Sequence, residues 1–553
     1  MNNTVKVLAL GLACGLGAAA VLAATDPAAQ IEQDLHRHIA ELASDAYEGR
    51  APGTAGEEKT VAWLQAAFEE LGAEPGNAGS WFQEVPITAV TTAPDAVLAI
   101  RGSDFSADWA YGSEMMAFTR RQVEQAGIEE SELVFVGYGI NAPERNWNDY
   151  ADVDVSGKTV VVLINDPGYA TQDPALFNGN AMTYYGRWDY KYDEAARQGA
   201  AAVLIVHETD AAAYPWEVVR SSWSGANIGL TADNQHLDKA AVEAWIPQAG
   251  AEALFAAAGL DYAQSKAAAA RPGFKARPLA GFHASVSLNN SLSTNLSRNV
   301  VALLPGSKYP DEVIIYSAHW DHLGVRPDAP GDNIYNGASD NASGVAALLA
   351  LTRQFMSADA PQRSIMMLAV TAEESGLLGS KYYSENPIFA PAKTVANLNM
   401  DNIAAGNIGR TRDVAVVGYG NSELEDYLAR AVRGQGREVV QEPYPEKGYY
   451  YRSDHFSLAR IGIPALYLTR STDSVEHGKE WGDARLRDYT ANHYHKPSDE
   501  YDPSWNLSGA VQEVMLLLEI GRELAANRDF PSWHEGVEFK RAREQSLAAP
   551  SRR

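Results

Sequence analysis

The apolar positions in the second half of the chain form short, nearly continuous runs that alternate with segments of helical periodicity. EVIIYSAH (312–319) and SIMMLAV (364–370) have the length and composition of buried strands, whereas GVAALLALTRQFM (344–356) has apolar residues every three or four positions. Strands that are apolar on both faces are typical of parallel sheets covered by helices on each side. We therefore expect an α/β fold, an α/β/α sandwich with a mostly parallel central sheet.

The first half of the chain shows two further patterns. Residues 28–71 have helical spacing, interrupted by the glycine- and proline-containing segment YEGRAPGTAGEE (47–58). Between about residues 130 and 280, the strand-like runs KTVVVLIND (158–166) and AAVLIVHE (201–208) flank a helix-like stretch. This change of pattern predicts a small, separately folded unit inserted into the sandwich.

Length and charge narrow the classes of function. A chain of 553 residues is longer than one hydrophobic core usually organises, so we expect two domains or one domain with a large insertion. The formal net charge of -26 would repel the phosphates of nucleic acids and anionic membrane surfaces. We therefore expect no nucleic-acid partner.

Residues 1–24 have the pattern of an export signal. One Lys precedes the apolar run VLALGLACGLGAAAVLAA (7–24), and small residues lie near Ala23. We expect cleavage, which leaves a periplasmic or secreted chain without a membrane span; a retained anchoring helix is the alternative. Cys14 is the only cysteine, and the residues before it disfavour lipidation. The mature chain thus has no thiol for catalysis, and any metal must be held by His and carboxylates.

Side chains that bind metals follow three of the predicted strands. His319 ends the first strand, Glu373 and Glu374 follow the second, and Asp401 follows VANLNM (395–400). The carboxyl ends of parallel strands meet at one edge of a sheet, where ligands bind in such folds. We therefore expect these side chains to lie close together.

Two loops add further candidates. NGASDNASG (336–344) places Asp340 before a helix, and HYHKPSDEYD (493–502) contains His493 and His495. Each candidate has a simpler explanation, since Asp340 could cap the helix, the glutamate pair could form an acidic first turn, and Asp401 could belong to a turn. Together these explanations leave open why four elements end in ligand-type residues at one edge.

The ordered set of motifs resembles the zinc-dependent aminopeptidase family, which also contains glutamate carboxypeptidase and the glutaminyl cyclases. The set comprises His319-x-Asp321, Asp340, Glu373-Glu374, Asp401, and His495 followed by Asp499. Two further segments, LASDAYEGRAPGTAGEEKTVAWL (42–64) and YRSDHFSLARIGIPALYL (451–468), are similar to parts of the family. SGKTVVVLINDPG (156–168) with KYDEAARQGAAAVLIV (191–206) resembles the protease-associated domain of exported peptidases.

The resemblance implies a site for two zinc ions. His319 and Asp401 would hold one ion, and Glu374 and His495 would hold the other. Asp340 would bridge the two. Imidazole and carboxylate are suitable zinc ligands, and two neighbouring zinc ions can hold a water and polarise a scissile carbonyl.

The resemblance also implies three catalytic or orienting roles. Glu373 would be the general base that activates the water. Asp321 would accept the free ring N–H of His319 and fix its orientation. Tyr494 would steady the oxyanion with its hydroxyl.

Four other residues near these motifs have weaker assignments. His322 has no catalytic assignment and is expected at a structural or rim position. Asp454 and His455 are expected beside the site or in a structural role. His493 lies one position too early for the ligand motif, although exchange with His495 stays open.

The expected function is that of an exported di-zinc aminopeptidase acting on peptides with a free N-terminus. The alternatives are a carboxypeptidase or dipeptidase of the glutamate carboxypeptidase type, a glutaminyl cyclase, or a binding protein that has lost its metals. The expected domains are a signal peptide (1–24), the first part of the catalytic domain (25–120), an inserted protease-associated domain (121–285), the rest of the catalytic domain (286–540) and a tail (541–553).

Overall fold

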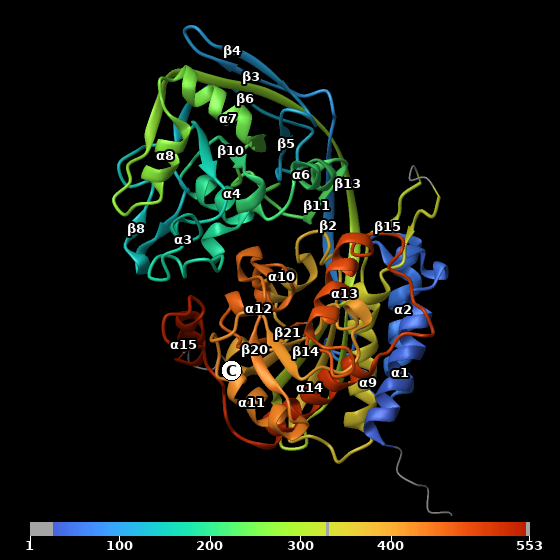
Figure 1. Ribbon diagram of the computed structural model, residues 1–553. Coiled ribbons are helices and arrows are strands. Elements are labelled where there is room, and N and C mark those ends of the chain that lie inside the picture. Colours follow the sequence, from blue (N-terminus) through green and yellow to red (C-terminus); the bar gives the residue numbers. More distant parts are fainter. Residues whose placement is uncertain (1–25, 328–330, 470, 549–553) are drawn as a thin grey trace, which may run out of the picture.

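The computed structural model describes residues 26–327, 331–469 and 471–548. The predicted export signal lies outside these residues. Figure 1 shows a lower body, in which helices cover a sheet, and an upper body formed by residues from about 97 to 288. No helix of the described residues combines the length and the apolar character needed to cross a membrane.

Four parallel strands form the centre of the lower sheet. Their spatial order is β17 (Arg363–Val370), β14 (Tyr309–His319), β18 (Thr394–Asn399) and β21 (Ala465–Thr469). Antiparallel pairs extend the sheet on both sides, except that the outermost strand β20 pairs with β19 in parallel. The flanking strands are β13 (Arg277–Leu304), β1 (Glu74–Pro75), β2 (Phe82–Thr92), β11 (Ala226–Leu230), β19 (Asp413–Val416) and β20 (Glu438–Gln441).

Helices cover both faces of this sheet. One face packs against α1 (Pro27–Leu42), α2 (Ala55–Glu70), α9 (Ser343–Met356), α11 (Leu424–Gln435) and α14 (Ser508–Ala526). The other face packs against α10 (Leu378–Glu385) and α12 (His455–Arg460). Ile314 and Tyr316 face the first set, whereas Val313 and Ile315 face the second, because successive side chains of a strand point to opposite faces. The predicted α/β fold with a mostly parallel central sheet is confirmed.

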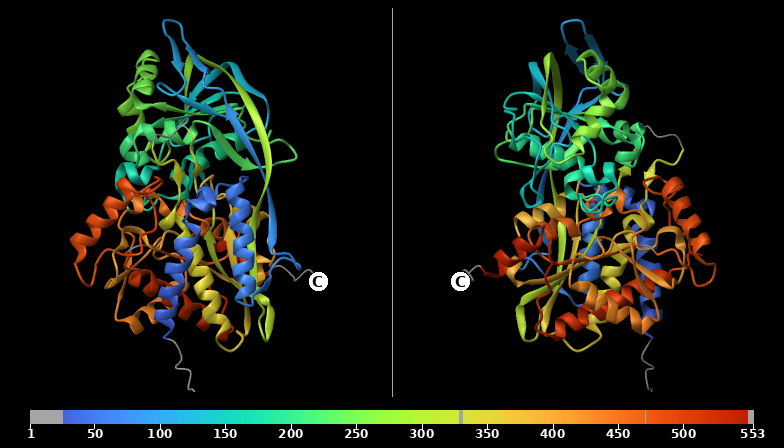
Figure 2. Two further views of the ribbon diagram at one scale, coloured as in Figure 1. Left: turned by 90° about the vertical axis from the view of Figure 1, so that its right-hand side faces the viewer. Right: turned by 60° about the vertical axis from the view of Figure 1, so that its left-hand side comes forward.

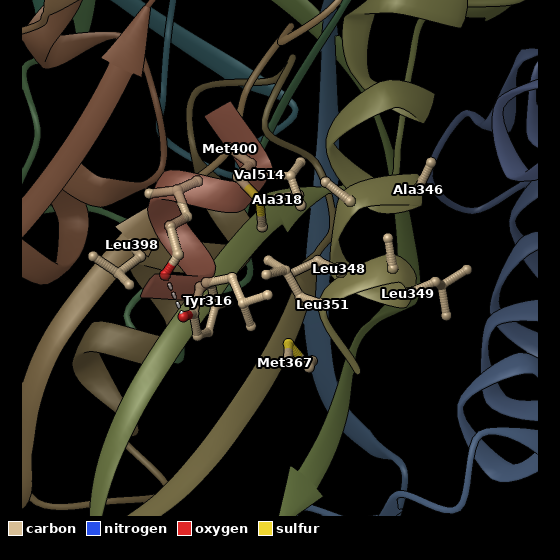
Figure 3. Packing of buried hydrophobic residues seen from close by; sticks show 14 of the residues in the cluster. Tyr316, Ala318, Ala346, Leu348, Leu349, Leu351, Met367, Leu398, Met400 and Val514 are labelled. Carbon is tan, nitrogen blue, oxygen red and sulfur yellow. Dashed lines mark hydrogen bonds between the residues drawn. The ribbon is translucent and has the colours of Figure 1, made fainter. Parts of the chain in front are cut away.

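Dense packing fixes helix α9, which begins just after Asp340. Leu348 and Leu351 of α9 are fully buried against the sheet (Figure 3). Burial of each such side chain stabilises the fold by about 1.5–3 kcal/mol. Tyr316 of β14 reaches across to α14 and donates a hydrogen bond of 2.7 Å to the carbonyl of Leu517. A Cβ at Gly521 would overlap this hydroxyl, so glycine permits the close approach.

The upper body has its own sheet and its own cores. Its strands are β3 (Val97–Arg101), β4 (Ser106–Ala110), β5 (Met116–Phe118), β6 (Gln125–Phe135), β9 (Thr159–Leu163), β10 (Ala202–His207) and β12 (Val242–Pro247). Its helices include α3 (Pro167–Thr171), α4 (Trp188–Arg197), α5 (Thr209–Ala212), α6 (Trp216–Trp223), α7 (Gln248–Ala257) and α8 (Tyr262–Ala269). The resemblance of this body to a protease-associated domain stays a prediction.

Strand β13 joins the two bodies. Its first part pairs with β6 and β3 of the upper sheet, and its last part pairs with β2 and β17 of the lower sheet. Figure 2 shows this strand running between the bodies. The pairing extends the upper sheet to Val97, before the expected start at 121, and helix α15 (Lys540–Ala548) covers much of the expected tail. The domain limits themselves stay a prediction.

Candidate metal centre

The carboxyl ends of three parallel strands meet at one edge of the lower sheet. There His319 ends β14, Glu373 and Glu374 follow β17, and Asp401 follows β18. Asp340 comes from the turn that precedes α9. The structure thus brings together the side chains that the sequence places after separate strands.

The first group of ligand-type atoms surrounds His319. The Nε2 atom of His319 lies 3.2 Å from Oδ1 of Asp340 and 3.5 Å from Oδ1 of Asp401. All three side chains are buried or nearly buried. The group combines one imidazole with two carboxylates, which is a suitable donor set for zinc.

The second group surrounds His495. Its Nε2 atom lies 3.0 Å from Oε2 of Glu374 and 3.3 Å from Oδ2 of Asp340. Asp340 therefore presents Oδ1 to one group and Oδ2 to the other. A single carboxylate therefore faces two imidazoles, one through each of its oxygens.

The spacing of these atoms fits zinc. Ligand atoms about 2.0–2.2 Å from a tetrahedral zinc ion lie roughly 3.3–3.6 Å from one another. The observed separations around His319 and His495, from 3.0 to 3.5 Å, are close to this range. In the part of the chain that the structure describes, Nε2 of each imidazole is buried without a hydrogen-bond partner. Both atoms are therefore available as metal ligands.

Burial alone lowers the pKa of both imidazoles, but the carboxylates around them outweigh it. The pKa of His495 rises to about 10, chiefly because of Glu374 and Asp340. The pKa of His319 rises well above its usual range, chiefly because of Glu373. The centre thus carries an excess of buried negative charge that attracts cations, whether protons or metal ions.

Glu373 and Tyr494 lie beside the two groups. The Oε2 atom of Glu373 is 4.0 Å from Nε2 of His319, so its carboxylate faces the centre from the same loop as Glu374. The ring of Tyr494 stacks on His495 with a centroid distance of 3.9 Å and is 42% exposed. These positions suit a base and a side chain at the mouth of the site.

Asp321 orients more than the ring of His319. The Nδ1 atom of His319 lies 3.2 Å from the backbone carbonyl of Asp321 but 3.7 Å from its carboxylate. The carboxylate instead accepts hydrogen bonds from the backbone amides of Glu373, at 3.1 Å, and Glu374, at 3.4 Å. Asp321 therefore fixes the glutamate loop with its side chain and the imidazole with its main chain.

His322 contacts Glu374, which the sequence did not predict. Its Nδ1 atom lies 2.6 Å from Oε1 of Glu374, and its buried Nε2 atom has no hydrogen-bond partner among the described residues. Together with Asp340 and Glu374 it forms a further group able to hold a metal ion. Glu374 thus has one carboxylate oxygen against His322 and the other against His495.

Hydrogen bonds from neighbouring side chains hold the ligand loops in place. Asp499 accepts from the backbone amides of Ser339 and Asp340, each at 3.1 Å. Asn341 accepts from the amide of Asn402, at 3.0 Å, and so connects the loops of Asp340 and Asp401. Such contacts orient ligands and sustain metal affinity.

Arg50 anchors two of the ligand loops from a distant part of the sequence. Its buried guanidinium donates to the carbonyls of Trp320, at 2.8 Å, Asn336, at 2.6 Å, and Gly337, at 2.9 Å, and also to Leu42. Trp320 follows His319, and Gly337 precedes the turn of Asp340. Burial lowers the pKa of Arg50 to about 10, while Asp321 and nearby carboxylates oppose this shift. The guanidinium therefore fixes both loops and adds one positive charge beneath the acidic centre.

We expect Arg50→Met to lower the free energy of unfolding by about 3–4 kcal/mol, since several buried carbonyls lose their donor. Urea unfolding of zinc-free protein would measure this effect without a contribution from metal binding. Arg220→Met is the matched control, because Arg220 is exposed and pairs with Glu217 at the surface. Equal, small changes in both variants would contradict the anchoring role.

Three remaining candidates lie in different settings. Asp454 is buried, its Oδ1 atom has no hydrogen-bond partner within the described ranges, and burial raises its pKa to about 7. His455 packs against Tyr450 with a ring distance of 4.6 Å, and burial lowers its pKa to about 3. His493 lies 3.0 Å from the carbonyl of Ser498 rather than beside the ligand groups.

Comparison with known proteins finds similar sequences and a similar fold. Residues 299–518 match the model of peptidase family M28. The chain is 28% identical over 246 residues to a probable lipoprotein aminopeptidase of Mycobacterium tuberculosis, covering 42% of this chain and 46% of that protein. It is 37% identical over 117 residues to a probable zinc metalloprotease of Pyricularia oryzae, covering 20% and 22%. The alignments therefore span less than half of these relatives.

Among solved structures, the aminopeptidase from Aneurinibacillus sp. strain AM-1 matches with a TM-score of 0.50 and 21% identity, covering 91% of this chain and 97% of that chain. At this identity the match shows a shared fold. The segment matched by the family model contains all five predicted metal ligands. Over residues 299–518 the chain is therefore similar to peptidase family M28.

Proposed function

We propose that this protein is a zinc-dependent aminopeptidase that removes N-terminal residues from peptides and holds two zinc ions. The observation that carries the proposal is the position of Asp340, whose two oxygens lie 3.2 Å from His319 Nε2 and 3.3 Å from His495 Nε2. Asp401 would complete the first site and Glu374 the second. The names of the relatives support zinc and aminopeptidase activity.

The residues around the centre have the chemistry that peptide hydrolysis needs. Bound zinc would polarise the scissile carbonyl and lower the pKa of a water molecule. The carboxylate of Glu373 would take a proton from the attacking water and deliver it to the leaving amine. The hydroxyl of Tyr494 would donate a hydrogen bond to the oxygen on which negative charge develops.

The charge of the centre favours a substrate amine over a substrate carboxylate. Carboxylates in and around the two groups carry more negative charge than two divalent ions neutralise; they are Asp321, Asp340, Glu373, Glu374, Asp401, Asp454 and Asp499. A protonated N-terminus is attracted to a position among these carboxylates, whereas a C-terminal carboxylate at that same position is repelled. This argument favours an aminopeptidase over a carboxypeptidase.

We further propose that the chain is exported and that its upper body is a protease-associated domain. The leader pattern of residues 1–24 supports export, as does the lipoprotein named among the relatives. The parallel strands β9, β10 and β12 with helices α4 and α7 support a separately folded insertion.

A substrate panel tests the activity. The mature chain, from about residue 25, would be given free and N-acetylated aminoacyl anilides, blocked acidic dipeptides and a Gln-initiated peptide. We expect cleavage of the free-amine anilides alone. Cleavage of the blocked acidic dipeptides would indicate a carboxypeptidase, and pyroglutamate without release of an amino acid would indicate a glutaminyl cyclase.

A further inference from the structure

Two arginines from different bodies lie at the junction above the metal centre. Arg187 follows the short turn η3 (Tyr184–Gly186) of the upper body, and Arg452 follows η8 (Tyr449–Tyr451) of the lower body. The two turns are in contact, since the rings of Tyr184 and Tyr451 have a centroid distance of 6.0 Å. Each arginine therefore follows a turn that lies at the same interface.

Neither arginine is well paired. The Nε atoms of both are buried and have no hydrogen-bond partner in the described part of the chain. Arg187 has one distant partner, Asp189, whose Oδ1 atom is 3.7 Å from its Nε. No carboxylate of the described residues forms an ion pair with Arg452, although the chain as a whole carries a net charge of -26.

The two positive charges act on each other and on the same neighbours. Burial lowers the pKa of Arg452, and the charge of Arg187 lowers it further. Both arginines also act on Tyr214, whose pKa is raised chiefly by burial. Arg187 is buried, Arg452 is half-buried, and Asp189 is the one carboxylate paired with either of them among the described residues. Two like charges with so little compensation are unfavourable, and a bound anion would offset the repulsion.

The arginines are close to the metal centre. Arg452 directly precedes Ser453, whose Oγ donates a hydrogen bond of 2.6 Å to Oδ2 of Asp401. The ring of Tyr494, which is 42% exposed, stacks on His495 at the mouth of the same centre. A ligand bound beside Asp401 that extends along the segment of Ser453 would therefore approach Arg452.

We propose that Arg187 and Arg452 form a subsite for a carboxylate on the residue that follows the cleaved bond, so that the preferred substrates are dipeptides or peptides with an acidic second residue. This inference rests on the proposed aminopeptidase function. The planar guanidinium donates paired hydrogen bonds that match a carboxylate. The amine of such a dipeptide would lie at the acidic centre and its carboxylate at the arginine pair, a span of roughly 7 Å at about 3.3–3.6 Å per residue.

The test compares substrates that differ only in the second residue. With X as the N-terminal residue that is cleaved fastest, the panel holds X-Leu, X-Leu-amide, X-Asp-amide and X-Asn-amide. We expect kcat/KM to be at least about tenfold higher for a carboxylate substrate than for its neutral partner, mainly through KM. The X-Leu pair reports on the C-terminal carboxylate, and the X-Asp pair reports on an acidic side chain.

Substitutions assign any preference to the arginines. Arg187→Gln and Arg452→Gln should each bring the carboxylate-to-neutral ratio close to one, and Arg452→Lys should restore part of it. Arg220→Gln is the matched control, because Arg220 belongs to the upper body, is exposed and pairs with Glu217. The control should keep the full ratio.

The outcomes separate the two proposals. Turnover of all four peptides without any preference for a carboxylate would overturn the subsite and leave the aminopeptidase function intact. A preference that survives both glutamine substitutions would also overturn the subsite. Absence of turnover for every peptide would overturn the proposed function, and the subsite with it.

Discussion

Glu373→Gln is expected to lower kcat by about 10²–10⁴-fold, which is the usual contribution of a general base. The amide has nearly the same size as the carboxylate, but it cannot take a proton from water. The Oε2 atom of Glu373 lies 4.0 Å from Nε2 of His319, and Glu373 is not among the residues that form the two proposed ligand sets. The variant should therefore keep its zinc while it loses turnover.

Two measurements on the same sample decide this prediction. Elemental analysis would give the zinc content, and release of amino acid from an aminoacyl anilide would give kcat. Glu385→Gln is a suitable control, because Glu385 ends helix α10 away from the centre. If the Glu373 variant kept near-normal turnover, the assignment of the base would be wrong.

His495→Ala is expected to remove one zinc equivalent and most of the activity. The imidazole contacts both Glu374, at 3.0 Å, and Asp340, at 3.3 Å, so its loss leaves the second ligand set without this donor. The set around His319 keeps all of its members. We therefore expect one ion to stay bound, with kcat/KM lowered by about 10²-fold or more.

His493→Ala provides a matched control in the same loop. His493 contacts Ser498 and lies outside both ligand groups, so its variant should keep both zinc equivalents and near-normal activity. Retention of both ions by the His495 variant would contradict the ligand assignment. His322, which contacts the other oxygen of Glu374, would then be the first candidate to replace it.

The sequence allowed much of the centre to be predicted, because its ligands follow apolar strands. A buried parallel strand can be recognised from its run of apolar residues, and the direction of such strands places their carboxyl ends together. This reasoning brought His319, Glu374 and Asp401 to one edge, as the structure has them. The helices expected within residues 28–71 are also present, as α1 and α2.

Residues that act through long-range contacts could not be found in this way. Arg50 lies in a segment that the sequence presents as a break between helices, and its partner Trp320 is 270 positions away. The pattern of the chain carries no sign of that contact. His322 was visible in the motif, but its distance to Glu374 depends on how Asp321 positions the glutamate loop. The same holds for Arg187 and Arg452, which follow turns of different bodies that touch through Tyr184 and Tyr451.

The central claim is that turnover depends on two zinc ions held around Asp340. The most direct test removes metal from the mature chain with a chelator, returns zinc stepwise, and follows release of amino acid from a free aminoacyl anilide. The account predicts no turnover without zinc, full recovery near two equivalents per chain, and no cleavage of the N-acetylated substrate at any step. Full turnover of the stripped chain, or cleavage that ignores the N-acetyl group, would contradict it.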